Sequence, residues 1–332
     1  MQTNSNFSMP LTQRVNSFIK RSPARMAVII AALLYAFTIM MVPEALNVRA
    51  ISTIAMLTIL LSFASAGQTI VLIGGGLDMS VGAVMSAAAI LTTSIMNGQD
   101  GMFIPSFVVV ISMGAVVGFV NGICTTKIGL PALIVTMVIS NIVARLQFVF
   151  TAGSPFGFAG PRFIQSVISR PLPPPFSEVP ALALYALVIF PLVFYILNRS
   201  RFGRQLYLVG SNSNAAKLSG INVNKIKILS YVISGMFAGF AGMLGAGFMQ
   251  SAQVQMFDEY AFNSLIAVIV GGTTFAGGVG NYSGSIAGAL MMVVLSNMLS
   301  ALQLSQPIRN IMLGAVLILL LTLYNRKKPV RL

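Results

Sequence analysis

The chain has 332 residues, of which 56% are hydrophobic and only 8% are charged, and its mean hydropathy is +0.89. Roughly a quarter of a soluble domain is charged, so this composition excludes one and predicts a membrane protein. The net charge of +14 raises the question of nucleic-acid binding, but the basic residues lie in loops between apolar runs and not on one soluble face. We therefore expect the chain to contact membrane lipid and no nucleic acid.

Missing residue types narrow the chemistry further. The chain has no histidine and a single cysteine, Cys124, which removes the commonest general base and metal ligand and any disulfide within the chain. No glycine-rich segment ends in the Gly-Lys-Ser/Thr of a nucleotide-binding loop. We expect no catalytic residue, no metal and no cofactor, so any ATP hydrolysis would take place on a separate subunit. The polar, basic start of the chain shows no cleavable signal peptide.

The apolar runs predict an all-α polytopic membrane protein with about ten transmembrane helices, some of them broken by glycines, because one crossing needs roughly 20 apolar residues. In chain order the runs are 26–42, 50–73, 80–96, 103–120, 130–150, 181–197, 228–250, 262–275, 284–302 and 308–324. The stretch from Ala50 to Met96 is interrupted only by three glycines and Asp78. It could instead be one helix followed by a broken or re-entrant piece.

The orientation follows from the basic residues, which concentrate in cytoplasmic loops. If the N-terminus is inside, most Lys and Arg residues fall in inner segments and the outer loops keep only Arg49, Arg162 and Arg170. This predicts cytoplasmic tails at 1–25 and 325–332 around a transmembrane domain at 26–324.

Two loops are long. The outer loop 151–180 contains Pro173-Pro174-Pro175 and is expected to be an extended, stiff segment, either a plain connector or a docking rim. The inner loop 198–227 is basic. Within it, Asn214 is expected to cap a short helix that Gly220 ends.

The first break in an apolar run is Gly74-Gly75-Gly76-Leu77-Asp78-Met79-Ser80-Val81-Gly82. Glycines allow a membrane helix to break, and the freed backbone groups then need partners in protein or in a watery cavity. Asp78 is the only acidic residue near the membrane in this topology, which makes it a candidate functional residue. Alternatively, its carboxylate only caps the helix that starts at Met79.

A second glycine-rich break runs from Val270 to Asn281 and weakly echoes the first, as an internal repeat would. The candidate gating residues in the two breaks are Gly75, Gly76, Asp78, Ser80, Gly82, Gly271, Gly272, Thr273, Gly277, Gly278 and Gly280.

Small and polar residues within the apolar runs predict helix contacts. Gly114, Gly118 and Gly122 recur every four residues, and a further glycine series lies within 235–247, a pattern that favours close helix packing in lipid. Lipid exposure of polar side chains is costly, so each bonds a neighbouring helix or faces a substrate path. The candidates for such a path are Gln68, Asn121, Asn141 and Asn263.

Three blocks of sequence together resemble one family. The segment Gly75 to Gly82 resembles the GGIDLSVG signature of ribose-type sugar permeases of bacterial ABC importers, with Leu77 and Met79 as conservative departures. Residues 202–223 look like that family's cytoplasmic coupling segment, although Ser211 and Asn214 depart from the usual residues. The third block is 269–280. The resemblance covers roughly residues 26–324.

The resemblance implies a permease domain at 26–324 in the bacterial inner membrane, with 151–180 periplasmic and 198–227 contacting the ATPase. It implies import of a monosaccharide or a related polyol or furanose, without discriminating among them. The implied partners are a cytoplasmic sugar-importer ATPase, a periplasmic sugar-binding protein and a second permease subunit, identical or different. The implied coupling residues are Arg204, Gly210, Asn212, Ala215, Ala216, Ser219 and Gly220.

Two other classes of membrane protein fit the sequence less well. An ion-coupled secondary transporter usually needs membrane carboxylates to bind its coupling ion, and only Asp78 qualifies. A membrane enzyme would need histidines or paired carboxylates within the apolar runs, and the sequence has neither.

Overall fold

The computed structural model describes residues 23–169, 179–305 and 307–315, and all regular structure in these ranges is helical. Six helices in them are long and apolar enough to cross a membrane, and α8 with α9, bent by 59°, would make a seventh. The six are α2 (Pro23–Met41), α3 (Val48–Ile73), α5 (Phe103–Thr126), α6 (Ala132–Thr151), α11 (Val223–Met249) and α13 (Tyr282–Ala301). The polytopic all-α prediction is confirmed, whereas the count of ten is not.

The glycine breaks account for part of the difference in count. Helix α4 (Val81–Met96) and helix α12 (Tyr260–Val270) are shorter apolar helices. At 1.5 Å per residue they extend about 24 Å and about 16 Å, less than the roughly 30 Å of a bilayer core. A last helix occupies 307–315, the only part of the run 308–324 that is described. The stretch from Ala50 to Met96 is thus a complete helix, a break and a short helix.

The remaining elements are short helices and one bent pair. They are η2 (Pro43–Ala45), η3 (Asp100–Met102), α7 (Pro161–Ile168), α8 (Leu182–Asn198), α9 (Arg201–Ser211) and α10 (Ser213–Leu218). Helix α7 corrects the expectation of an extended segment throughout 151–180. Pro161 begins the helix, where its missing N–H costs nothing, and an Asp100 Oδ1 accepts the backbone N–H of Arg162 at 2.8 Å. The run Pro173-Pro174-Pro175 lies outside the described residues.

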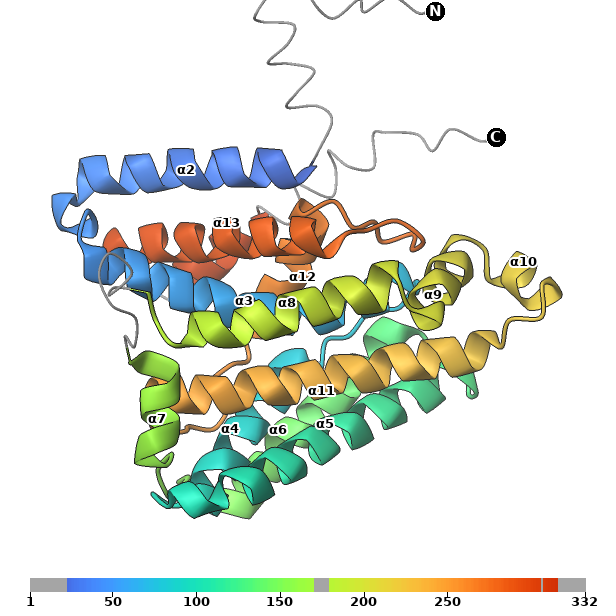
Figure 1. Ribbon diagram of the computed structural model, residues 1–332, viewed down its shortest axis with the longest axis horizontal. Helices are drawn as coiled ribbons and strands as arrows, with labels where there is room; N and C mark the ends of the chain where they lie inside the picture. Colours follow the sequence, from blue (N-terminus) through green and yellow to red (C-terminus); the bar gives the residue numbers. More distant parts are fainter. Residues whose placement is uncertain (1–22, 170–178, 306, 316–332) are drawn as a thin grey trace, which may run out of the picture.

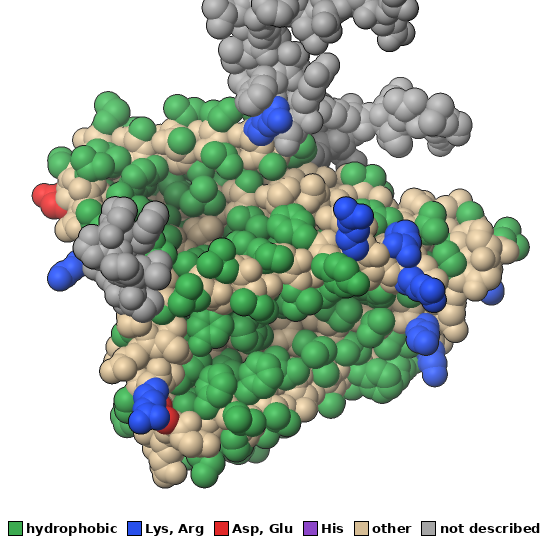
Figure 2. All heavy atoms as spheres, viewed as in Figure 1, with side chains coloured by type: hydrophobic (Ala, Val, Ile, Leu, Met, Phe, Trp, Pro, Cys, Tyr) green, Lys and Arg blue, Asp and Glu red, His purple; other side chains and the backbone are tan. Residues whose placement is uncertain are grey.

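The long helices lie side by side along one axis (Figure 1). Helices α9 and α10 and the start of α11 lie at one end, called here the basic end, because Lys and Arg side chains gather there (Figure 2). The α2–α3 connection and α7 lie at the opposite end. The positive-inside rule predicts that the basic end faces the cytoplasm.

Helices α5 and α11 pack backbone to backbone. A Cβ atom on Gly118 would lie 2.1 Å from the Tyr231 carbonyl oxygen, and one on Gly114 would lie 2.2 Å from the Gly235 carbonyl oxygen. No side chain fits at either distance, so only glycine allows this approach. The close packing predicted from the four-residue spacing is confirmed.

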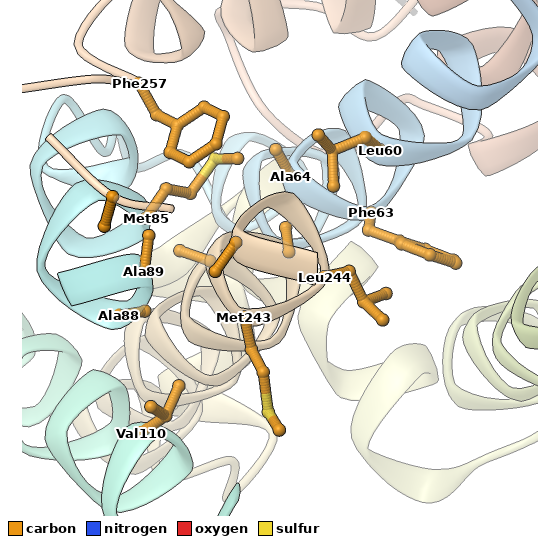
Figure 3. Close-up of a cluster of buried hydrophobic side chains, with 14 of the residues drawn as sticks. Leu60, Phe63, Ala64, Met85, Ala88, Ala89, Val110, Met243, Leu244 and Phe257 are labelled. Atoms are coloured by element: carbon orange, nitrogen blue, oxygen red, sulfur yellow. The ribbon is translucent and has the colours of Figure 1, made fainter. Parts of the chain in front are cut away.

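The centre of the bundle is formed by α3, α4 and α11. The largest apolar cluster includes Phe63 of α3, Met85 of α4, Val110 of α5 and Leu244 of α11 (Figure 3). Helices α2, α5 and α6 leave an apolar face exposed, as lipid contact requires. Helix α4 is buried along almost its whole length, so its surroundings are protein and not lipid.

Candidate functional site

The two glycine breaks lie against each other at the basic end of the bundle, although they are far apart in sequence. The backbone N–H of Gly278 donates to the carbonyl oxygen of Ile73 at 2.8 Å. A Cβ on Gly277 would lie 2.9 Å from the Cα of Gly75. The second break therefore packs directly on the end of α3.

Helix α9, which lies within the predicted cytoplasmic loop 198–227, packs against both breaks at this contact. A Cβ on Gly210 would lie 1.8 Å from the Ile73 oxygen and 2.5 Å from the Gly278 nitrogen, so only glycine fits there. The hydroxyl of Tyr207 donates to the Gly280 carbonyl at 2.9 Å. We call the meeting point of 73–75, 277–280 and 206–210 the glycine junction.

Asp78 lies fully inside the protein, within the first break. Its Oδ1 accepts the backbone N–H of Ser80 at 3.0 Å and the Ser80 hydroxyl at 2.6 Å, and its Oδ2 accepts the Ser234 hydroxyl of α11 at 2.8 Å. The Asn121 amide of α5 donates to Ser80 Oγ at 2.8 Å. The N-cap of α4 is Ser80, so Asp78 is not the helix cap. It stabilises the turn before the helix and joins that turn to α11 and, through Ser80, to α5.

Other backbone groups freed by the break also find partners in protein. The N–H of Met79 donates to Thr136 Oγ1 of α6 at 3.0 Å. The Tyr231 hydroxyl accepts the N–H of Leu77 at 3.2 Å. A Cβ on Gly76 would lie only 2.6 Å from this hydroxyl. A Cβ on Gly82 would lie 2.6 Å from the Phe257 carbonyl. The first break is thus held by three neighbouring segments: α6, α11 and the loop before α12.

The rest of the second break contacts the start of the bundle. Gly271 packs on the backbone of Gly284, and Gly272, with a φ of 98°, lies beside Pro23 of α2. The hydroxyl of Thr273 is buried without a hydrogen-bond partner.

The predicted coupling loop folds as two short helices joined by a turn. Ser200 caps α9 by accepting the N–H of Gly203 at 2.9 Å, and the Arg204 guanidinium donates to the Arg199 carbonyl at 2.8 Å, which holds the bend after α8. Asn212, and not Asn214, caps α10, because its Oδ1 accepts the N–H groups of the second and third residues of that helix, Asn214 and Ala215, at 3.1 and 3.0 Å. Both residues are short polar cap formers, and spacing alone did not separate them.

Most of the short helix α10 is exposed. Gly220, with a φ of 79°, ends the helix as predicted. Ala215 and Ser219 are exposed, whereas Ala216 is buried against the bundle. Leu218, which the sequence did not single out, is 91% exposed at the tip of the helix.

The four predicted path residues do not form one site. Asn121 belongs to the Asp78 network. Asn141 is exposed on α6 and donates only to the Met137 carbonyl of its own helix, at 2.9 Å. Gln68 is buried on α3 with neither carboxamide atom hydrogen-bonded. Asn263 lines two cavities at the opposite end of the bundle.

Several residues of the site carried no sequence signal. Thr136, Tyr231 and Ser234 each hold the first break. They are single hydroxyl residues within apolar runs, where such residues usually bond their own helix, and only the fold shows which of them face the break.

Residues 50–321 match the family described as "Branched-chain amino acid transport system / permease component". The ribose import permease of Escherichia coli strain K12 is 33% identical, over 80% of this chain and 81% of the relative. The galactose/methyl galactoside import permease of the same strain is 28% identical, over 85% and 88%. The fructose import permease of Rhizobium meliloti is 29% identical, over 86% and 81%. No solved structure matches the chain.

Proposed function

This chain belongs to the transport-system permease family that includes the ribose import permeases, and we propose that it moves a monosaccharide through the inner membrane as one of two permease subunits of an ATP-driven importer. A cytoplasmic ATPase supplies the energy, and a periplasmic sugar-binding protein delivers the substrate. The relatives named for ribose, galactose and fructose support a sugar, and they support an importer over an ion-coupled transporter.

The glycine junction is the observation that carries this proposal. An importer needs a mechanical link from the ATPase to the membrane helices, and α9 touches the ends of both glycine breaks through backbone atoms. A push on α9 is passed to α3 through Ile73 and to the second break through Gly278. Because no flexible side chain lies between these backbones, little of the displacement is lost in side-chain rotation.

Helix α10 is the proposed docking point for the ATPase. It lies at the basic end, and the apolar side chain of Leu218 is almost fully exposed there. An exposed leucine on a short, capped helix fits a pocket on a partner. Ala216 faces the bundle, so it supports α10 from behind and does not touch the ATPase.

The Asp78 network is the proposed hinge of the gate. It fixes the break between α3 and α4 to α11 and α5 through hydrogen bonds. Such a break lets α4 change its angle to α3 while the network keeps the freed backbone groups bonded. This assigns Asp78 a structural role at the hinge, and none in binding sugar or protons.

Transport by the reconstituted importer tests the function. Vesicles containing the permease and its ATPase are loaded with ATP and supplied with the binding protein and radiolabelled ribose, galactose, fructose or leucine. We expect uptake of one sugar, dependent on ATP. Uptake of leucine alone, as the family description would allow, or uptake driven by an ion gradient without ATP, would refute the proposal.

A pair of leucine variants tests the docking point. Leu218→Asp is expected to abolish co-purification of the ATPase and sugar-stimulated ATP hydrolysis, because the added charge would have to be desolvated on docking. The control is Leu46→Asp, which changes a leucine that is 66% exposed at the opposite end. Equal co-purification with both variants would refute the assignment of α10.

A further inference from the structure

At the end of the bundle opposite the glycine junction, two adjoining cavities share Glu259 and Asn263. Their volumes are about 210 Å³ and about 270 Å³. The combined volume of the two cavities falls in the range of about 300–1,000 Å³ that is typical of small-ligand sites. They lie between α12, the last turns of α13 and the helix at 307–315. We call them together the polar groove.

The lining of the polar groove is unusual for a membrane-facing surface. It contains the carboxylate of Glu259, the amides of Asn263, Asn297 and Asn310, and the hydroxyl of Ser296, beside the aromatic rings of Tyr260 and Phe262. Amide, carboxylate and hydroxyl groups bond the hydroxyls of a sugar, and aromatic rings cover its apolar face. Lipid tails could satisfy none of these polar groups. The lining therefore fits a polyhydroxylated ligand.

A buried amide continues the polar groove toward the centre of the membrane. Leu57 and Leu61 of α3 line the groove, and at about 100° per residue Gln68 lies on the same stripe of α3, within about 20° of each and about 10 Å beyond Leu61. The Gln68 side chain is 0% exposed, and neither its oxygen nor its nitrogen has a hydrogen-bond partner among the described residues. A buried amide without partners costs several kcal/mol, so a ligand or water is needed there.

We propose that the polar groove and Gln68 form the outer part of the sugar's path, in which Asn263 and Asn297 bond the hydroxyls of the incoming monosaccharide and Gln68 receives them next. This proposal rests on the proposed function and names the residues of its path. It leaves out Asn141, whose amide is bonded to its own helix, and Asn121, which supports the Asp78 network.

Kinetics of uptake supply the first test. Asn263→Ala and Asn297→Ala are each expected to raise KM for the transported sugar about tenfold, as loss of one hydrogen-bonding partner predicts. Gln68→Leu should lower uptake without lowering the melting temperature, because it removes an unpaired buried amide. The matched control is Asn141→Ala, which should leave KM unchanged. If Gln68→Leu lowers both the uptake and the melting temperature, the role of Gln68 is structural and the proposed inner end of the path is wrong.

Cysteine labelling tests the groove independently of any sugar. The chain has one cysteine, so Cys124→Ser gives a background in which Asn263→Cys and Asn141→Cys are compared within the assembled importer. A charged, membrane-impermeant methanethiosulfonate added outside should modify the cysteine at 263 at least about tenfold faster than the cysteine at 141, because the groove admits water to position 263. Equal rates would overturn the proposed path even if the importer carries a sugar. Conversely, fast labelling at 263 in an importer that carries no sugar would contradict the proposed function and leave the groove water-filled.

Discussion

Replacing Asp78 by alanine removes three hydrogen bonds at once. The Ser234 hydroxyl can turn to a carbonyl of its own helix, but the Ser80 N–H loses its acceptor, Asp78 Oδ1. A buried unpaired N–H costs about 1–3 kcal/mol. We therefore expect Asp78→Ala to lower the melting temperature of the detergent-purified protein by several degrees. Uptake should fall in proportion to the folded fraction.

Asp78→Asn is the matched variant. Its side-chain oxygen still accepts from Ser80, and its amide can donate to the Ser234 hydroxyl, so its stability should stay within about 1 kcal/mol of the unmodified protein. Thermal unfolding followed by size-exclusion chromatography, with ATP-dependent uptake measured on the same preparations, separates the two effects. If Asp78→Ala unfolds at the unmodified temperature but transports nothing, the carboxylate acts directly in gating and the structural assignment is wrong.

Three further predictions follow from the packing and the charge pattern. Gly210→Ala should cost about 1–3 kcal/mol by overpacking and uncouple sugar uptake from ATP hydrolysis, whereas Gly101→Ala, which has no atom within 4 Å of its added Cβ, should do neither; equal effects would count against the glycine junction. Gly118→Ala should reduce the yield of folded protein, measured as the monodisperse fraction, since α5 must move away from α11; an unchanged yield would contradict that packing. A reporter that is active only in the cytoplasm should be active when fused to Met1 or to Leu332. Activity of a reporter that works only in the periplasm, at either end, would refute the orientation.

The sequence was sufficient for the long apolar helices and for the positions of the two glycine breaks, because apolar length and glycine content are local properties. It also predicted the contact of the four-residue glycine series, since Gly114 and Gly118 fall on one face of a helix. It could not predict that Gly210 meets Gly278, because the two residues lie in separate segments and no sequence pattern shows that these segments come together. For the same reason Asn141 and Gln68 looked alike in sequence, although one is exposed and the other is buried without a partner.

The lengths of α4 and α12 were the other point that the sequence left open. A run of apolar residues predicts a crossing, but where a helix stops depends on which neighbours bond the freed backbone groups. For α4 these neighbours include Thr136 and Tyr231, which come much later in the chain.

The burial of α4 has a consequence for biosynthesis. When α4 leaves the ribosome, its inward hydroxyls have no tertiary partners, and one of them, on Ser86, later accepts the N–H of Phe257, which is synthesised 171 residues afterwards. At about 5–20 residues per second, that interval is roughly ten to thirty seconds. During it α4 is a short, hydroxyl-bearing helix without its final neighbours, in a bilayer that solvates it poorly. The half-made chain therefore passes through a period in which membrane proteases and insertion chaperones compete for it, and synthesis of α11 and the loop after it ends that period.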